Sequence, residues 1–74
     1  MSELKLEGRV ARNATDEIQI HAGEYWKKQV IDFRWYSNDK PTKKGIRMNL
    51  EEAQRVHAIL TRVLREMISD VEMD

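Results

Sequence analysis

Basic and aromatic residues are concentrated in the middle third of this 74-residue chain. Residues 27–47 carry seven Lys or Arg against two Asp or Glu, whereas the segments on either side are net acidic, so the overall net charge of zero hides a basic centre. All five aromatic side chains fall between Tyr25 and Tyr36. A single-stranded nucleic acid is bound by cations that follow its phosphates and by flat rings on which its unpaired bases stack. The sequence therefore predicts binding of single-stranded DNA, with RNA as an alternative ligand.

The predicted binding residues are the exposed cations and rings of this basic centre. They are Tyr25, Trp26, Lys27, Lys28, Arg34, Tyr36, Lys40, Lys43, Lys44 and Arg47. Tyr25 and Trp26 fall in an expected hairpin connection beside two lysines, where rings are poorly placed for a core. Phe33 and Trp35 share the apolar face of a strand with Ile31, so we expect these three side chains to hold the sheet to a helix.

Two alternatives stay open within this set. Arg34 either forms a structural ion pair with Asp32 or a helix carboxylate, or presents its guanidinium to solvent or a phosphate. The Lys43-Lys44-Gly45 segment is either an ordinary loop or a place where the glycine lets backbone approach a phosphate closely.

Catalytic and metal-binding residues are sparse. His21 and His57 lie 36 positions apart, and the chain has no cysteine and no glycine-rich phosphate loop. The adjacent acids at 16–17 and 51–52 point in different directions on a strand or helix rather than converging. We expect no enzyme activity, no cofactor and no metal site.

Alternating apolar and polar residues predict four strands, and a longer period predicts one helix. The expected strands cover residues 4–12, 18–22, 28–36 and 46–48, with turns at 13–16 and 37–41 and with Gly23 closing the second strand. Asn49 is an expected N-cap that forms a capping box with Glu52. Apolar residues then recur every three or four positions over about five turns. The result is an α+β fold in a single domain spanning residues 1–74.

The helix is long for so small a sheet, because about 20 residues at 1.5 Å each span ~30 Å. A short chain without disulfides also has a thin stability margin, and self-association is a common remedy. The near-heptad spacing of the apolar residues favours packing against a partner helix in a homodimer. The expected dimer interface comprises Val56, Leu60, Val63, Leu64 and Met67.

Residues 30–36, with the sequence VIDFRWY, precede a turn and then KKGIRMN at 43–49. In motif, spacing and order of elements this region resembles the transcriptional coactivator family called positive cofactor four. The resemblance covers residues 17–70 and implies a curved four-stranded antiparallel sheet followed by one helix (ββββα). It also implies dimerisation through the helix and channels for single strands.

Position by position, the resemblance implies that Tyr25 stacks on bases and that Lys28, Arg34 and Lys44 are binding cations. Ser37 stands where many members have a tryptophan, so that stacking contact is either lost or supplied by Tyr36 or Trp26. The family's regulatory tail, rich in serine and lysine, is missing. We therefore expect a compact bacterial or phage-like member without the activator-dependent role.

The N-terminus lacks the apolar run of a signal peptide, and no segment approaches the ~20 apolar residues of a membrane span. We expect an intracellular, cytoplasmic, nucleoid-associated protein that acts in transcription, replication or repair and contacts proteins of those processes. The main rival is a protein-interaction module that uses the amphipathic helix and the exposed aromatics. Duplex binding is a minor rival.

Overall fold

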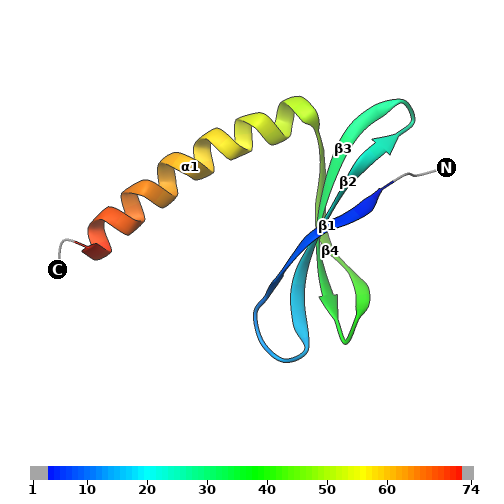
Figure 1. Cartoon of the computed structure of the whole chain (residues 1–74), viewed down its shortest axis with the longest axis horizontal. Coiled ribbons are helices and arrows are strands. Elements are labelled where there is room, and N and C mark those ends of the chain that lie inside the picture. The colour runs from blue at the N-terminus through cyan, green and yellow to red at the C-terminus, as the bar shows by residue number, and fades with distance from the viewer. Residues whose placement is uncertain (1–3, 73–74) are drawn as a thin grey trace.

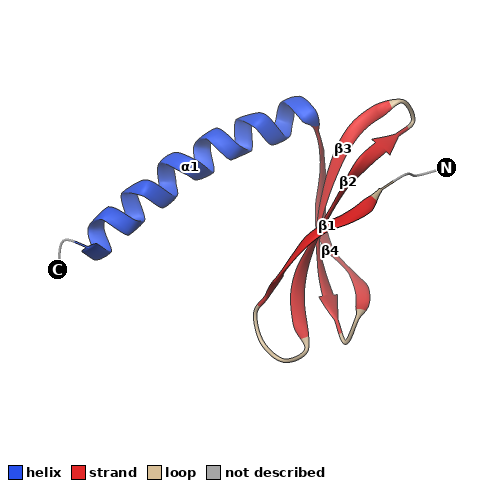
Figure 2. Ribbon diagram, in the orientation of Figure 1, coloured by secondary structure: helices blue, strands red, loops and turns tan. Residues whose placement is uncertain are grey.

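The computed structural model describes residues 4–72, which form four strands followed by one helix (Figure 1). The elements are β1 (Lys5–Ala11), β2 (Asp16–Tyr25), β3 (Lys28–Ser37), β4 (Lys40–Asn49) and α1 (Leu50–Glu72). Neighbouring strands are antiparallel, and their order in the sheet is β1-β2-β3-β4. The predicted ββββα fold with a curved, open sheet is confirmed (Figure 2).

The strands β2 and β4 are longer than the sequence pattern predicts. Gly23 does not close β2 but pairs with Val30, and β2 continues to Tyr25. Pro41 and residues 43–45 likewise belong to β4 rather than to a turn or loop. Proline is tolerated there because β4 lies at the edge of the sheet.

Two-residue turns join the long strands. Trp26 and Lys27 connect β2 to β3 with φ angles of 53° and 63°, and Asn38 and Asp39 connect β3 to β4 with 52° and 66°. Positive φ at both central residues is the mark of the type I′ hairpin turn, whose twist matches that of the flanking strands. Trp26 is thereby held at the tip of a hairpin.

The β1–β2 loop lies at the opposite end of the sheet from Trp26. The side-chain oxygen Oδ1 of Asn13 accepts hydrogen bonds from the backbone N–H groups of Thr15 at 2.9 Å and Asp16 at 2.8 Å, which confirms the predicted turn. The backbone N–H of Asn38 donates to the carbonyl of Thr15 at 2.9 Å. This loop and the β3–β4 turn are therefore joined.

The pairing register divides the side chains between two faces, because paired residues in neighbouring antiparallel strands point to the same side. The apolar face comprises Val10, Ile18, Ile20, Ala22, Ile31, Phe33, Trp35, Ile46 and Met48. The polar face comprises Arg9, Glu17, Gln19, His21, Tyr25, Lys28, Asp32, Arg34, Tyr36 and Arg47, with the apolar residues Leu6 and Val30 among them. The predicted separation of the two sides of β3 is confirmed.

A capping box starts α1, as predicted. The backbone N–H of Asn49 donates to Glu52 Oε1 at 2.9 Å, and the N–H of Glu52 donates to Asn49 Oδ1 at 2.8 Å. These bonds satisfy backbone donors that have no partner inside the helix. Within residues 4–72, no helix combines the length and apolar character that a membrane crossing requires.

Only the first turns of α1 lie over the sheet, and the rest of the helix extends away from it (Figure 1). Ile31, Phe33 and Met48 on the apolar face line a hollow of about 370 Å³ together with helix residues including Leu50 and Leu60. The prediction that Trp35 also holds the sheet to the helix is wrong. Trp35 lies further along β3, beyond Phe33, because the helix leaves from the other end of that strand.

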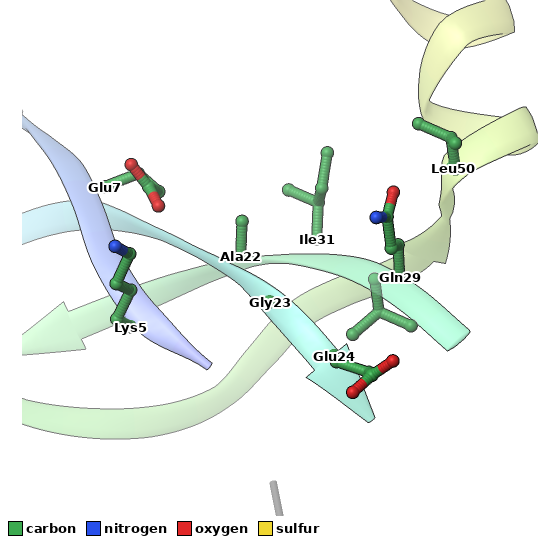
Figure 3. A pocket seen from close by; sticks show the side chains of 9 residues that line it. Lys5, Glu7, Ala22, Gly23, Glu24, Gln29, Ile31 and Leu50 are labelled. Atoms are coloured by element: carbon green, nitrogen blue, oxygen red, sulfur yellow. The ribbon is translucent and has the colours of Figure 1, made fainter. Parts of the chain in front are cut away.

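A second hollow of about 490 Å³ lies beside the start of α1 (Figure 3). The side chains of Glu7, Ala22 and Ile31 rise from the same side of the sheet as Leu50. This hollow continues the uncovered side of the sheet toward β1, where Lys5, Glu7, Glu24 and Gln29 also line it.

A single chain leaves most of its apolar surface open. Among the described residues, Met48 is the one buried hydrophobic side chain, at 8% exposure. The accessible surface is 6519 Å², whereas a compact protein of 8.8 kDa exposes roughly 4,800 Å². The radius of gyration is 14.7 Å, against about 11 Å for a compact domain of this length. The chain therefore lacks the closed core of an ordinary monomer.

Candidate nucleic-acid interface

A buried carboxylate, that of Asp32, lies at the centre of the polar face. Asp32 is 6% exposed, and its Oδ2 accepts hydrogen bonds from Arg47 Nη2 at 2.9 Å and Nε at 3.3 Å. Arg34 Nη2 lies 3.5 Å from the same oxygen, while Arg34 Nη1 donates to the carbonyl of Thr42 at 2.9 Å. Arg34 thus forms the structural ion pair, the first of its two alternatives. Two guanidinium groups share one carboxylate, so the cluster keeps one net positive charge.

Gly45 makes room for the Arg34 side chain. A Cβ atom at Gly45 would lie 2.6 Å from the carbonyl oxygen of Phe33 and 2.9 Å from Arg34 Cζ. The loop alternative for Lys43-Lys44-Gly45 is wrong, because the segment belongs to β4, and the chain's own Arg34 fills the space over the glycine. The glycine therefore makes room for the Arg34 guanidinium.

A first group of rings lies where β2 turns into β3. Tyr25 is the last residue of β2 rather than part of the connection, and the Arg47 guanidinium carbon lies 5.2 Å from its ring centroid. Trp26 is 79% exposed and meets Tyr25 edge to face, with ring centroids 6.0 Å apart and planes at 81°. Lys27 and Lys28 follow directly. Rings and cations are therefore adjacent here, as the sequence predicts.

A second ring pair lies further along the polar face. Tyr36 stacks on His21, with ring centroids 6.0 Å apart and an interplanar angle of 21°. Tyr36 lies eight positions from Lys28 along β3, roughly 26 Å at ~3.3 Å per residue, whereas His21 lies four positions from Tyr25 along β2, roughly 13 Å. The sequence did not indicate a site role for His21. Its placement depends on the β2–β3 register, which the residues of β2 alone do not specify.

The ten predicted site residues do not form one continuous surface. Lys28, Arg34, Tyr36 and Arg47 share the polar face with Tyr25, and Trp26 and Lys27 cap one end of it. Lys40 and Lys43 lie in β4 toward the opposite end, and Lys44 lines hollows on the apolar side beside Trp35. All five predicted lysines are exposed, and none forms an ion pair with the side chains described in residues 4–69.

The residues predicted for the dimer interface line one side of α1. Val56, Leu60, Leu64 and Met67 are 44–60% exposed, and Val63 is half-buried. Val56 and Leu60 also face the apolar hollow against the sheet. The open apolar surface of the helix is therefore continuous with that of the sheet.

Acidic and histidine side chains do not converge elsewhere. Among residues 4–69, whose side chains the structure describes, no three His, Asp or Glu side chains are placed to hold a metal ion. His21 lies on the polar face of the sheet, and His57 lies on α1 beside the apolar hollow.

Comparisons with models of known families, with curated proteins and with solved structures give no significant match. The resemblance to the positive cofactor four family therefore remains a prediction from the motifs of residues 30–36 and 43–49 and from the order of the elements.

Proposed function

We propose that this chain is a homodimeric protein that binds single-stranded DNA with little sequence preference, and that it is a compact relative of the positive cofactor four family. The binding surface is the polar face together with the Trp26–Lys27 turn. One observation carries this proposal: the register places Tyr25, Lys28, Arg34, Tyr36 and Arg47 on the face opposite the apolar residues.

The chemistry of this face suits an unpaired strand. Base stacking on aromatic side chains contributes ~1–3 kcal/mol per base and tolerates any sequence, because every base has a π-face. Tyr25 with Trp26 and Tyr36 with His21 provide two stacking positions. Lys28 and the Arg34–Arg47 cluster provide positive charge between and beside them. α1, with its acidic first turn at Glu51 and Glu52, begins over the apolar side and so keeps these carboxylates away from the polar face.

A second copy of the chain is the partner that the open apolar surface fits. The exposed surface exceeds that of a compact protein by about 1,700 Å² per chain, so two copies have some 3,400 Å² to cover. Obligate homodimers bury ~2,000–5,000 Å². A two-fold pair uses the same patch on both subunits, and here that patch comprises the part of the apolar face beside α1, around Ile31, Phe33 and Met48, and the α1 residues Val56, Leu60, Val63, Leu64 and Met67.

Such a protein would act on exposed single strands in transcription, replication or repair. We place it in the cytoplasm, in association with the nucleoid. RNA is the alternative ligand, and proteins of those processes are the expected partners.

The test is a titration with labelled oligo-dT of about 20 nucleotides, longer than a ~4–16-nucleotide site, at low and high salt with a duplex competitor. We expect tighter binding to oligo-dT than to duplex and a loss of affinity as salt rises. Lys28→Met should weaken binding, whereas Arg55→Met, which removes one exposed charge from α1, should not. Absence of binding at low salt would refute the proposal.

One observation favours the rival function of a protein-interaction module, namely the exposed apolar side of α1. Sedimentation separates the two proposals. A dimer that binds oligo-dT supports the first, and a stable monomer that ignores oligo-dT supports the rival.

A further inference from the structure

Trp35 lies at the far end of the apolar face from α1, beside a hollow of about 360 Å³. The Arg12 guanidinium carbon lies 4.3 Å from the centroid of the Trp35 ring. Asp16, Tyr36 and Lys44 also line this hollow. An indole flanked by cations thus lies outside the polar face.

The hollow carries a net positive charge. Lys44 and Arg12 form no ion pair within the part of the chain that the structure describes, and Asp16 is the single carboxylate in the lining. Asp16 Oδ1 accepts a hydrogen bond from the Thr15 hydroxyl at 3.2 Å. A cation–π pair between Arg12 and Trp35 would account for those two side chains, but it leaves Lys44, an exposed residue that lines the same hollow, without a structural role.

We infer that this hollow is a second nucleotide site, in which a phosphate of the bound strand lies between Arg12 and Lys44 and its base lies against Trp35. The inference rests on the proposed function and extends the binding surface around the end of the sheet. Tyr36 links the two sites, because it belongs to the polar face by register and also lines the hollow. A single strand of DNA that stacks on Tyr36 therefore has only to pass around the end of the sheet to reach Trp35.

The loops around the site are already joined. The hydrogen bond from Asn38 N–H to the Thr15 carbonyl ties the β3–β4 turn to the β1–β2 loop. The Thr42 hydroxyl donates to the Trp35 carbonyl at 2.7 Å and accepts from the Lys44 N–H at 3.2 Å. The backbone that carries Trp35 and Lys44 is therefore fixed before a ligand arrives, which lowers the ordering cost of binding.

The two tryptophans lie toward opposite ends of the sheet and can report on the two sites separately. Trp26→Phe leaves the Trp35 signal, and Trp35→Phe leaves the Trp26 signal. We expect oligo-dT of about 20 nucleotides to quench both. In the Trp26→Phe protein, Arg12→Met should reduce the Trp35 quench and lower the steepness of log K against log salt by about 0.7, the value for one lost phosphate contact.

Controls keep the result specific to the site. Arg12→Lys, which keeps the charge, should restore the salt dependence, and Arg55→Met should leave it unchanged. If Trp26 responds to oligo-dT while Trp35 does not, or if Arg12→Met leaves the salt dependence unchanged, the second site is refuted and the proposed function stands. If neither tryptophan responds and labelled oligo-dT is not bound, both are refuted.

Discussion

The backbone of the Trp26–Lys27 turn should be strained, because Trp and Lys fit its conformation less well than other residue types do. Both residues have positive φ, and the left-handed region costs an L-residue roughly 1–2 kcal/mol. Asn-Gly is the pair that fits a type I′ turn best. Replacing both residues, Trp26→Asn with Lys27→Gly, should therefore raise the free energy of unfolding by about 1–3 kcal/mol, after the entropy cost of the added glycine.

The same replacement should weaken DNA binding, because it removes an exposed ring and a lysine. Loss of one stacked base costs ~1–3 kcal/mol, which is a roughly 5- to 150-fold loss of affinity. Thermal unfolding at fixed protein concentration should show a rise in Tm of roughly 4–20 °C. The oligo-dT titration measures the binding loss in the same preparation.

The second turn provides the matched control. Asn38 and Asp39 also have positive φ, but Asn and Asp tolerate that region better than Trp or Lys. Asp39→Gly should therefore stabilise the protein less and should not weaken binding. If replacing Trp26 and Lys27 adds no stability, the turn is not strained. If the replacement adds stability without loss of affinity, the Trp26–Lys27 turn does not contact the DNA.

Three further changes test other features. Gly45→Ala should lower the free energy of unfolding by about 1–3 kcal/mol in chemical denaturation, because the added Cβ meets backbone and Arg34. Gly8→Ala is the control and should leave stability unchanged, since no atom lies within 4 Å of its added Cβ. Equal stabilities of the two variants would contradict the close packing at Gly45. Asp32→Asn should lower stability but tighten oligo-dT binding, since it frees two guanidinium groups; weaker binding would argue against a phosphate role for them. Met67→Lys should raise the dimer dissociation constant at least about 100-fold in sedimentation, because the substitution removes apolar burial from both subunits of a two-fold interface. Ala58→Lys, on the opposite side of α1, should leave the constant unchanged. Equal effects of the two variants would place the interface elsewhere.

The features that the sequence predicts well are local. The capping box at Asn49 and Glu52 needs only four consecutive residues, and the two faces of β3 follow from strict alternation. Strand length is less local. Gly23 and Pro41 are usual turn residues, but pairing with neighbouring strands keeps both inside the sheet.

The features that the sequence could not predict depend on register and on the path of the helix. The stack of Tyr36 on His21 requires β2 and β3 to be aligned. The placement of Trp35 under Arg12 requires the helix to leave from the opposite end of β3. An apolar alternation shows that Trp35 shares a face with Phe33, but not which part of that face the helix covers.

The strand order β1-β2-β3-β4 leaves two free edges, and both carry charge. β1 includes Lys5, Glu7 and Arg9, while β4 includes Lys40 and Pro41, and proline has no N–H to offer an added strand. Lysine and proline at sheet edges oppose the edge-to-edge pairing that leads to fibrils. The open apolar face is therefore flanked by edges that oppose amyloid-like growth, and in the proposed dimer association is face to face and ends at two copies.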